Sequence, residues 1–276
     1  MSMIEIDSGT IYYDATGPED GRPVVFVHGY WMGGQVWRQV SARLADLGLR
    51  CIAPTWPMGA HTQPLRPCAD RTITGVAGIV AEVLAALDLN DVVLVGNDSG
   101  GVVSQLVAVH HPERLGALVL TSCDAFEHFP PPILNPVLVA ARSRVFFQAA
   151  IQAMRARAVR ERAYGGLAHR DIDDLARAWV RPALSSAAIA EDLRLLTLSF
   201  RTEVTTGVAA RLPEFDKPAL IAWSADDVFF EAGDGERLAA TLPRARLEVI
   251  EGARTFSMLD RPDRLADLMS TISVPR

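Results

Sequence analysis

A short glycine-bracketed segment between a buried strand and a helix most constrains what this chain can fold into. The apolar run Val92–Val95 is typical of a strand buried on both faces, and a helical pattern follows at Ser99–His110. A sharp strand-to-helix turn presents one side chain and needs small residues two places before and after it. Gly96 and Gly100 have this spacing around Asp98, so we predict that Asp98 stands above the carboxyl edge of a sheet. The alternative role for Asp98 is a simple helix cap.

Buried-strand patterns alternate with helical patterns over most of the chain. Ile4–Ile6 and Thr10–Asp14 open it as an antiparallel hairpin, and Thr72–Leu89 is the clearest amphipathic helix. This alternation predicts an α/β fold with a mostly parallel central sheet and helices on both faces. The expected parallel strands are Pro23–Val27, Arg50–Pro54, Val92–Val95, Leu118–Leu120, Ala219–Ala222 and Leu247–Ile250.

The middle of the chain lacks buried-strand runs. From Asp124 to Leu212 the sequence begins with a proline cluster and continues with arginine-rich helical patterns at Val145–Val159 and Ile172–Val180. We therefore predict a helical lid (cap) at residues 124–212. It is inserted between core strands of one α/β core formed by residues 1–123 and 213–276.

Composition excludes several classes of protein. The formal net charge of −6 gives no basic field for nucleic acid, and 49% apolar residues can bury a large core. The longest apolar stretches, such as Val76–Leu87, are shorter than the ~18–20 residues that span a bilayer. The three cysteines form no CxxC pair, which argues against a disulfide framework or a zinc site. We expect a cytoplasmic protein without a signal peptide. We also expect no metal, no cofactor and no membrane partner. The expected partner is a small-molecule substrate, and formation of a homodimer is possible.

The chain resembles the α/β-hydrolase superfamily over nearly its full length. The matching segments are Val25–Gly29, Pro54–Gly59, Gly96–Gly101 and Trp223–Asp227. An aspartate at the nucleophile position is similar to the haloalkane dehalogenase and epoxide hydrolase branch, and His28–Arg38 aligns with that branch without gaps. The resemblance implies that the backbone N–H groups of Tyr30 and Ser99 stabilise an oxyanion while water attacks the enzyme ester.

The aspartate decides which reactions suit the site. A carboxylate with an ordinary pKa of about 3.9 is ionised at neutral pH and attacks without a base. Attack on a saturated carbon bearing a halide or an epoxide oxygen gives a stable alkyl ester, whereas attack on an acyl carbon gives an anhydride. The chain departs from the branch at Ser99, where dehalogenases typically have tryptophan, and at Tyr30, where many have asparagine. It also has Trp31 where epoxide hydrolases usually have proline, and Tyr164 is its only lid tyrosine.

The resemblance places the triad acid at Asp227, with Asp226 as the register alternative. The triad histidine should follow the last strand, but the sequence there has Thr255. Threonine has no basic nitrogen and cannot activate water. Three accounts stay open: a histidine from elsewhere serves, Asp98 is itself a general base, or the protein binds a ligand without catalysis.

The six histidines are the candidates for a substitute base, and the last of them is His169. His128 lies where the core enters the lid, so it is our choice, with the neighbouring Asp124 and Glu127 as alternative acids. For substrate binding we select four residues near the strand-to-helix turn at Asp98 (the elbow): His28, Trp31, Asp124 and Phe126. The alternative for His28 is a purely structural role. Aromatic residues in these loops favour a hydrophobic small molecule.

The first functional hypothesis is therefore a hydrolase in which Asp98 attacks a carbon–halogen bond or an epoxide. The second is a non-hydrolytic lyase, isomerase or cyclase of secondary metabolism that uses Asp98 as a general base. The third is a catalytically silent ligand-binding relative. The identity of residue 255 separates the first hypothesis from the other two without deciding between them.

Overall fold

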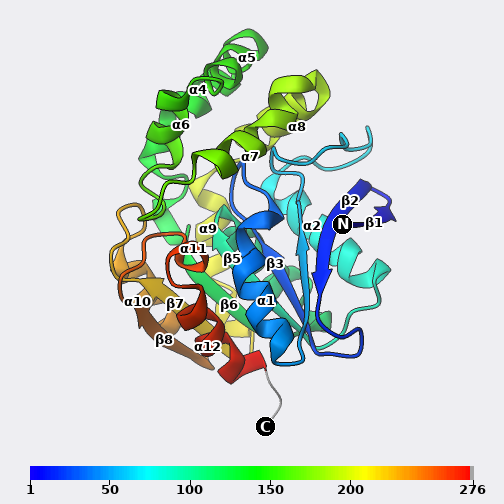
Figure 1. Ribbon diagram of the computed structural model, residues 1–276, viewed down its shortest axis with the longest axis vertical. Helices are drawn as coiled ribbons and strands as arrows, with labels where there is room; N and C mark the ends of the chain where they lie inside the picture. The colour runs from blue at the N-terminus through cyan, green and yellow to red at the C-terminus, as the bar shows by residue number, and fades with distance from the viewer. Residues whose placement is uncertain (274–276) are drawn as a thin grey trace.

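An eight-stranded sheet forms the centre of the molecule (Figure 1). The computed structural model describes residues 1–273. The strand order is β1-β2-β4-β3-β5-β6-β7-β8, and every neighbouring pair from β4 onward is parallel. The predicted mostly parallel sheet is thus confirmed. The strands are β1 Ser2–Ile6, β2 Gly9–Thr16, β3 Pro23–Val27, β4 Arg50–Pro54, β5 Val92–Asp98, β6 Leu115–Cys123, β7 Ala219–Ser224 and β8 Ala245–Ile250.

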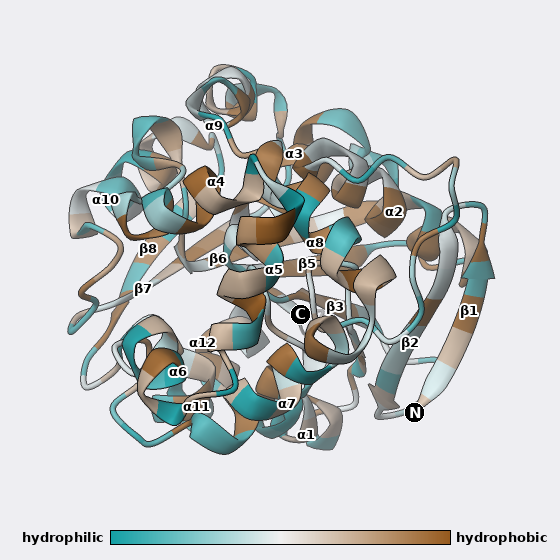
Figure 2. Cartoon of the chain, turned by 90° about the horizontal axis from the view of Figure 1, so that it is seen from above, coloured by the Kyte–Doolittle hydropathy of each residue, from teal (hydrophilic) through white to brown (hydrophobic). Residues whose placement is uncertain are grey.

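Helices cover both faces of the sheet (Figure 2). On one face α1 packs against α12, and on the other α2 packs against α3, which gives the predicted layered arrangement. The α-helices are α1 Arg38–Asp46, α2 Ile73–Ala86, α3 Ser99–His110, α4 Asn135–Ala141, α5 Arg144–Ala153, α6 Arg157–Tyr164, α7 Asp173–Ser185, α8 Ala187–Leu198, α9 Thr202–Ala209, α10 Ala232–Thr241, α11 Ser257–Asp260 and α12 Pro262–Ser273. Short 3-10 helices are η1 Gly34–Trp37, η2 Pro112–Arg114, η3 Phe126–His128, η4 Pro132–Leu134 and η5 Leu212–Glu214.

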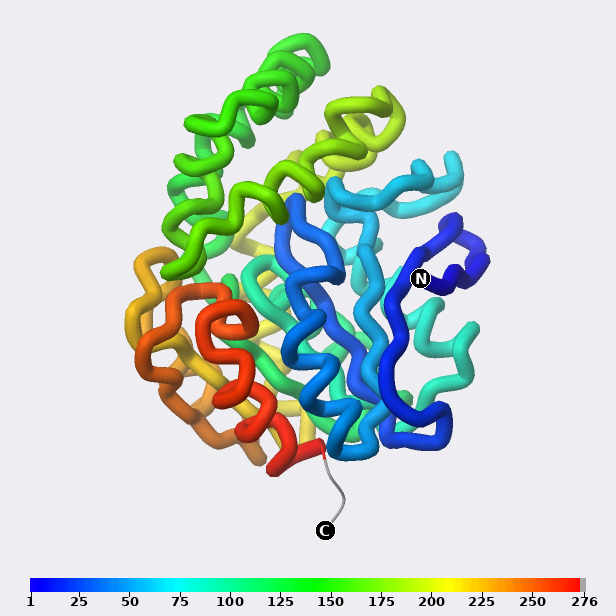
Figure 3. Tube along the Cα trace, viewed as in Figure 1, coloured from blue at the N-terminus to red at the C-terminus, as the bar shows by residue number. Residues whose placement is uncertain are grey.

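The apolar runs of the sequence become the inner strands. β3 and β5 lie side by side, and residues 24–27 of β3 and 92–95 of β5 are completely buried because helices cover them from both sides. The N-terminal hairpin lies at one edge of the sheet, and the chain returns at its end to place α12 beside α1 (Figure 3). Within residues 1–273, no helix is long and apolar enough to cross a membrane.

Between β6 and β7 the chain is helical, and α4–α8 stand over one end of the sheet (Figure 1). Two boundaries differ from the sequence prediction. The helix expected at Val145–Val159 is two helices, α5 and α6, separated by a turn at residues 154–156. Strand β5 does not stop at Gly96, because Asn97 and Asp98 continue to pair with β6. The sheet therefore delivers Asp98 directly to its carboxyl edge.

Candidate active site

Asp98 occupies a strained turn between β5 and α3. Its φ of 53° and ψ of −135° lie in a region that a residue with a side chain rarely adopts. Three glycines make the turn possible, because a Cβ on any of them would overlap other atoms. A Cβ on Gly96 would lie 2.5 Å from Ser104 Oγ, one on Gly100 would lie 2.3 Å from the Val27 carbonyl oxygen, and one on Gly101 would lie 2.2 Å from Cys123 Cβ. The backbone is thus built to present the Asp98 side chain.

Two backbone N–H groups hold one oxygen of the Asp98 carboxyl. Tyr30 N donates to Asp98 Oδ1 at 3.1 Å and Ser99 N donates to the same oxygen at 2.6 Å. These are the two donors that the resemblance implied for an oxyanion. A Cβ on Gly29 would lie 2.2 Å from Oδ1, so glycine is required there for the Tyr30 loop to come this close. Burial raises the pKa of Asp98 to about 6, while the Ser99 and Tyr30 N–H groups act in the opposite direction.

Thr255 and Asp227 meet beside this turn. The Thr255 hydroxyl donates to Asp227 Oδ1 at 3.0 Å, and the N–H groups of Phe229 and Phe230 donate to that oxygen at 2.8 and 3.0 Å. Asn97 fixes the same loop, since its Nδ2 donates to the Thr255 carbonyl oxygen at 2.9 Å. The loops after β7 and β8 therefore meet at the hydrogen bond between Thr255 and Asp227.

The register alternative Asp226 lies elsewhere. Its carboxylate accepts a hydrogen bond from His169 Nε2 at 2.9 Å on the exposed surface. Asp226 therefore pairs with His169 in the loop between α6 and α7, and Asp227 is the acid that faces Thr255.

A cavity of about 710 Å³, including the part open to solvent, lies over Asp98. Its wall is mostly apolar, and its ionisable groups other than tyrosine are Asp98 and Asp124. Tyr164 is not free to assist a reaction, because its hydroxyl donates to the Trp31 carbonyl oxygen at 2.9 Å. The lining residues are Tyr30, Trp31, Met32, Asp98, Ser99, Asp124, Pro131, Ile133, Leu134, Val137, Met154, Ala163, Tyr164, Leu167, Phe229 and Phe230.

Asp124 follows β6 and stands next to the elbow. Its Oδ2 accepts a hydrogen bond from Ser99 Oγ at 2.9 Å, and its backbone carbonyl accepts one from Gln105 Nε2 at 3.0 Å. Its side chain is 2% exposed. Burial, together with the charge of Asp98, raises the pKa of Asp124 well above its ordinary value. The contact through Ser99 was missed from sequence, because it depends on the register between β5 and β6.

His28 is placed differently from our prediction. Its Nε2 accepts a hydrogen bond from Trp56 N at 2.8 Å, and its Nδ1 lies 2.9 Å from the Gly29 carbonyl oxygen. Burial lowers the pKa of His28 to about 4, so the ring is neutral and Nδ1 carries the proton. Both nitrogens are used by the backbone and the ring does not line the cavity, so its assignment to substrate binding is corrected to a structural role.

His128 and Phe126 are also not in the cavity wall. His128 Nδ1 pairs with Asp234 Oδ2 at 2.8 Å, and the His128 side chain is 48% exposed. The Phe126 ring packs under the Arg237 guanidinium, 3.9 Å from ring centre to Cζ. The structure thus does not place His128 as a base beside Asp98, and it does not place Phe126 against substrate.

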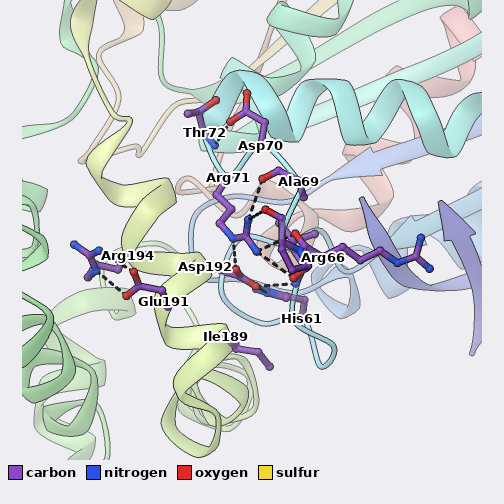
Figure 4. A network of polar contacts seen from close by, with 12 residues as sticks. His61, Arg66, Ala69, Asp70, Arg71, Thr72, Ile189, Glu191, Asp192 and Arg194 are labelled. Atoms are coloured by element: carbon purple, nitrogen blue, oxygen red, sulfur yellow. Dashed lines mark hydrogen bonds and ion pairs between the residues drawn. The ribbon is translucent and has the colours of Figure 1, made fainter. Parts of the chain in front are cut away.

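His61 belongs to a buried polar network (Figure 4). Its Nε2 lies 3.3 Å from Asp192 Oδ2, and the same carboxylate accepts hydrogen bonds from Leu65 N at 2.8 Å and Arg71 Nε at 2.6 Å. This network joins α8 to the loop that follows β4. It is structural, and it was not foreseen from the sequence.

Comparison with known proteins agrees with this architecture. The family model described as alpha/beta hydrolase fold matches residues 22–262. A cis-3-alkyl-4-alkyloxetan-2-one decarboxylase from Xanthomonas campestris is 27% identical over 267 residues, covering 90% of this chain and 87% of the relative. A haloalkane dehalogenase from Mesorhizobium japonicum is 31% identical over 129 residues, covering 46% and 40%.

Among solved structures, an alpha/beta hydrolase fold protein from Burkholderia ambifaria superposes with a TM-score of 0.81 at 20% identity, covering 97% of this chain and 96% of that one. The likeness to the solved structure concerns the fold, and the family match covers most of the sequence. The chain therefore belongs to the alpha/beta hydrolase fold family.

Proposed function

We propose that this protein is an enzyme that transforms a hydrophobic small molecule through the Asp98 carboxylate and completes its reaction without activating water, as a lyase or an isomerase. The observation that carries the proposal is the hydrogen bond from Thr255 to Asp227. A hydroxyl stands there in the place where the superfamily keeps the histidine that activates water.

The remaining histidines do not make up for this loss. His28 is neutral with both nitrogens engaged, and His128 pairs with Asp234. No imidazole is among the side chains that line the cavity in the described part of the chain. Because general-base help is typically worth about 10²–10⁴ in rate, a hydrolytic step at this site would be slow.

Asp98 itself has the properties of a general base. The two N–H donors bind Oδ1, and within residues 1–273 no hydrogen bond is found at Oδ2. Oδ2 is therefore the oxygen that is free to take a proton from a molecule in the cavity. A pKa of about 6 suits this role, since a base works best when its pKa lies near the working pH.

The cavity indicates the substrate class. Apolar side chains from η4, α4, the turn after α5, and α6 line the cavity together with Asp98 and Asp124. A molecule with an apolar body and one polar reacting group fits this distribution. The relative from Xanthomonas campestris is named a decarboxylase, and loss of CO₂ consumes no water, which supports a non-hydrolytic reaction.

A second candidate is the nucleophilic role, in which Asp98 attacks a carbon–halogen bond or an epoxide. It is favoured by the position of Asp98 in the elbow and by the haloalkane dehalogenase among the relatives. Attack would leave an alkyl ester on Asp98. Without a base, that ester would persist, so the second candidate predicts a stable adduct rather than turnover.

Incubation in ¹⁸O-labelled water separates the two. The panel contains long-chain 3,4-dialkyl β-lactones, apolar ketones, 1-haloalkanes and terminal epoxides, and both products and intact protein are weighed by mass spectrometry. Products without oxygen from the labelled water, lost in Asp98→Asn, are expected for a lyase or isomerase. Turnover that places ¹⁸O in the product contradicts that proposal. An adduct on Asp98 that Thr255→His releases supports the nucleophilic role instead.

A further inference from the structure

Four carboxyl groups crowd the carboxyl edge of the sheet. Asp98 ends β5, Asp124 follows β6, Asp227 follows β7, and Asp234 lies in α10. All four are close enough to Cys123, the last residue of β6, to raise the pKa of its thiol, to which burial contributes most. So many acids in one buried region cannot all be ionised unless each has its own compensating donors or cation.

Three of the four have such partners. Asp227 Oδ1 accepts three hydrogen bonds, from the Thr255 hydroxyl and two backbone N–H groups, although its Oδ2 is buried without a partner. Asp98 Oδ1 accepts two backbone N–H donors. Asp234 pairs with His128, whose pKa is raised by that hydrogen bond.

Asp124 is the carboxyl with the least compensation. Its only side-chain hydrogen bond in the described structure is to the Ser99 hydroxyl at Oδ2, and its Oδ1 is buried with no partner. The charged or titratable groups that face it are Asp98, Asp234 and the Cys123 thiol, and none of them is a cation. A neutral carboxylic acid needs no counterion, so one proton on Asp124 removes the electrostatic conflict.

We propose that Asp124 is the general acid of the site: it remains protonated while Asp98 is ionised, and it donates its proton to the oxygen of an apolar carbonyl substrate. The proposal rests on the proposed function and names its substrate class. Asp98, Ser99 and Asp124 line the same cavity, and the Ser99 hydroxyl donates to Asp124 Oδ2. The two backbone donors of the turn are occupied by Asp98 Oδ1, so another donor must serve the substrate oxygen.

The proposed enolisation moves one proton to Asp98 and one proton from Asp124. Asp98 Oδ2 takes the proton from the carbon next to the carbonyl, and the electron pair of that C–H bond forms the C=C bond of an enol. The pair of the C=O π bond moves to the oxygen, which takes the proton of Asp124. Asp98 is then neutral and Asp124 ionised. A neutral carboxylic acid kept in an apolar site to act as donor is an established device for enolisation.

Ser99 is suited to restore the starting state. Its hydroxyl donates to Asp124 Oδ2 at 2.9 Å and lies close enough to Asp98 to lower the pKa of that carboxyl. The hydroxyl can pass its proton to Asp124 while it takes one from Asp98. In this role Ser99 is a positioning residue, and Ser99→Ala should slow repeated turnover while a single enolisation proceeds.

Infrared spectroscopy of the protein alone tests the protonation of Asp124 and needs no substrate. At pH 8 the wild type should show a protonated-carboxyl C=O band that shifts in D₂O and is absent in Asp124→Asn. The matched control Asp226→Asn, at an exposed aspartate, should retain the band. In Asp98→Asn the band should disappear at a lower pH than in the wild type, because loss of the Asp98 charge lowers the pKa of Asp124. A wild type without the band, a band that persists in Asp124→Asn, or an unchanged midpoint in Asp98→Asn overturns the proposal.

The catalytic part is tested by α-hydrogen exchange of apolar ketones in D₂O. Asp124→Asn should reduce the exchange rate by about 10²–10⁴ and remove the loss of rate on the alkaline side of the pH profile. Exchange that is equally fast in Asp124→Asn overturns the acid role. The ¹⁸O experiment tests the proposed function independently of this acid role. ¹⁸O in the product contradicts a reaction without water, whatever the protonation state of Asp124.

Discussion

Replacing Asp98 by asparagine should stabilise the protein at neutral pH, and the gain should vanish in acid. The carboxyl is ionised above pH 6, yet burial disfavours its charge and no cation lies beside it within residues 1–273. A pKa that rises from 3.8 in the unfolded chain to about 6 in the folded protein removes roughly 3 kcal/mol of unfolding free energy above pH 6. Below pH 3.8 the group is neutral in both states and the penalty is absent.

Asparagine resembles the neutral form of the acid. Its carbonyl oxygen can keep the hydrogen bonds from Tyr30 N and Ser99 N, and its shape fits the same turn. Water that enters the cavity screens part of the charge, so we expect a gain of about 1–3 kcal/mol. For a protein of this length, each kcal/mol raises the melting temperature by about 2–4 °C.

Urea unfolding of wild type and Asp98→Asn at pH 4 and pH 8 measures the difference. The matched control is Asp20→Asn, at an exposed aspartate before β3, which should change little at either pH. The reasoning is refuted if Asp98→Asn is no more stable than wild type at pH 8, or if its gain is the same at both pH values. Activity should be lost in the same variant, because the proposed function assigns the reaction to the Asp98 carboxylate.

Three further predictions concern the surroundings of Asp98. Gly29→Ala should abolish activity in a folded protein, because its Cβ would lie 2.2 Å from Asp98 Oδ1; circular dichroism and turnover check this. His28 has a folded-state pKa of about 4, below its ordinary 6.5, so it contributes stability above pH 6.5 that is lost as pH falls towards 4. The pH dependence of unfolding should therefore be shallower between these values in His28→Gln. Asp192→Ala should cost about 3–5 kcal/mol in urea unfolding, because it leaves the Arg71 guanidinium without its buried partner.

The sequence predicts local features of this fold well, because their causes are local. The glycine spacing around Asp98 and the apolar runs of β3 and β4 depend on residues adjacent in the chain. Glycine suggested the end of a strand at Gly96. The strand continues instead, since pairing with β6 supplies the hydrogen bonds that a strand end would lack.

Side-chain directions could not be predicted in the same way. His128 follows the strand that leads from the core into the lid, but Asp234, which is 106 residues away, pairs with its ring. Phe126 has a positive φ of 52°, and its ring is covered by the guanidinium of Arg237, which lies 111 residues further along the chain. These contacts join segments that meet only in the folded chain, and no pattern within either segment indicates them.

The threonine at position 255 also affects the balance of charge around Asp98 and Asp227. In a triad, an imidazole that becomes a cation during the reaction lies beside the acid and compensates its charge. Thr255 can donate one hydrogen bond to Asp227, but it never becomes positive. The charges of Asp98 and Asp227 therefore add to each other at the buried edge of the sheet, and both contribute to the raised pKa of Cys123. A proton retained by a neighbouring carboxyl is the remaining way to lower that charge. Under our proposal, the proton that Asp124 retains lowers this charge, and the same proton is the one that a carbonyl substrate receives.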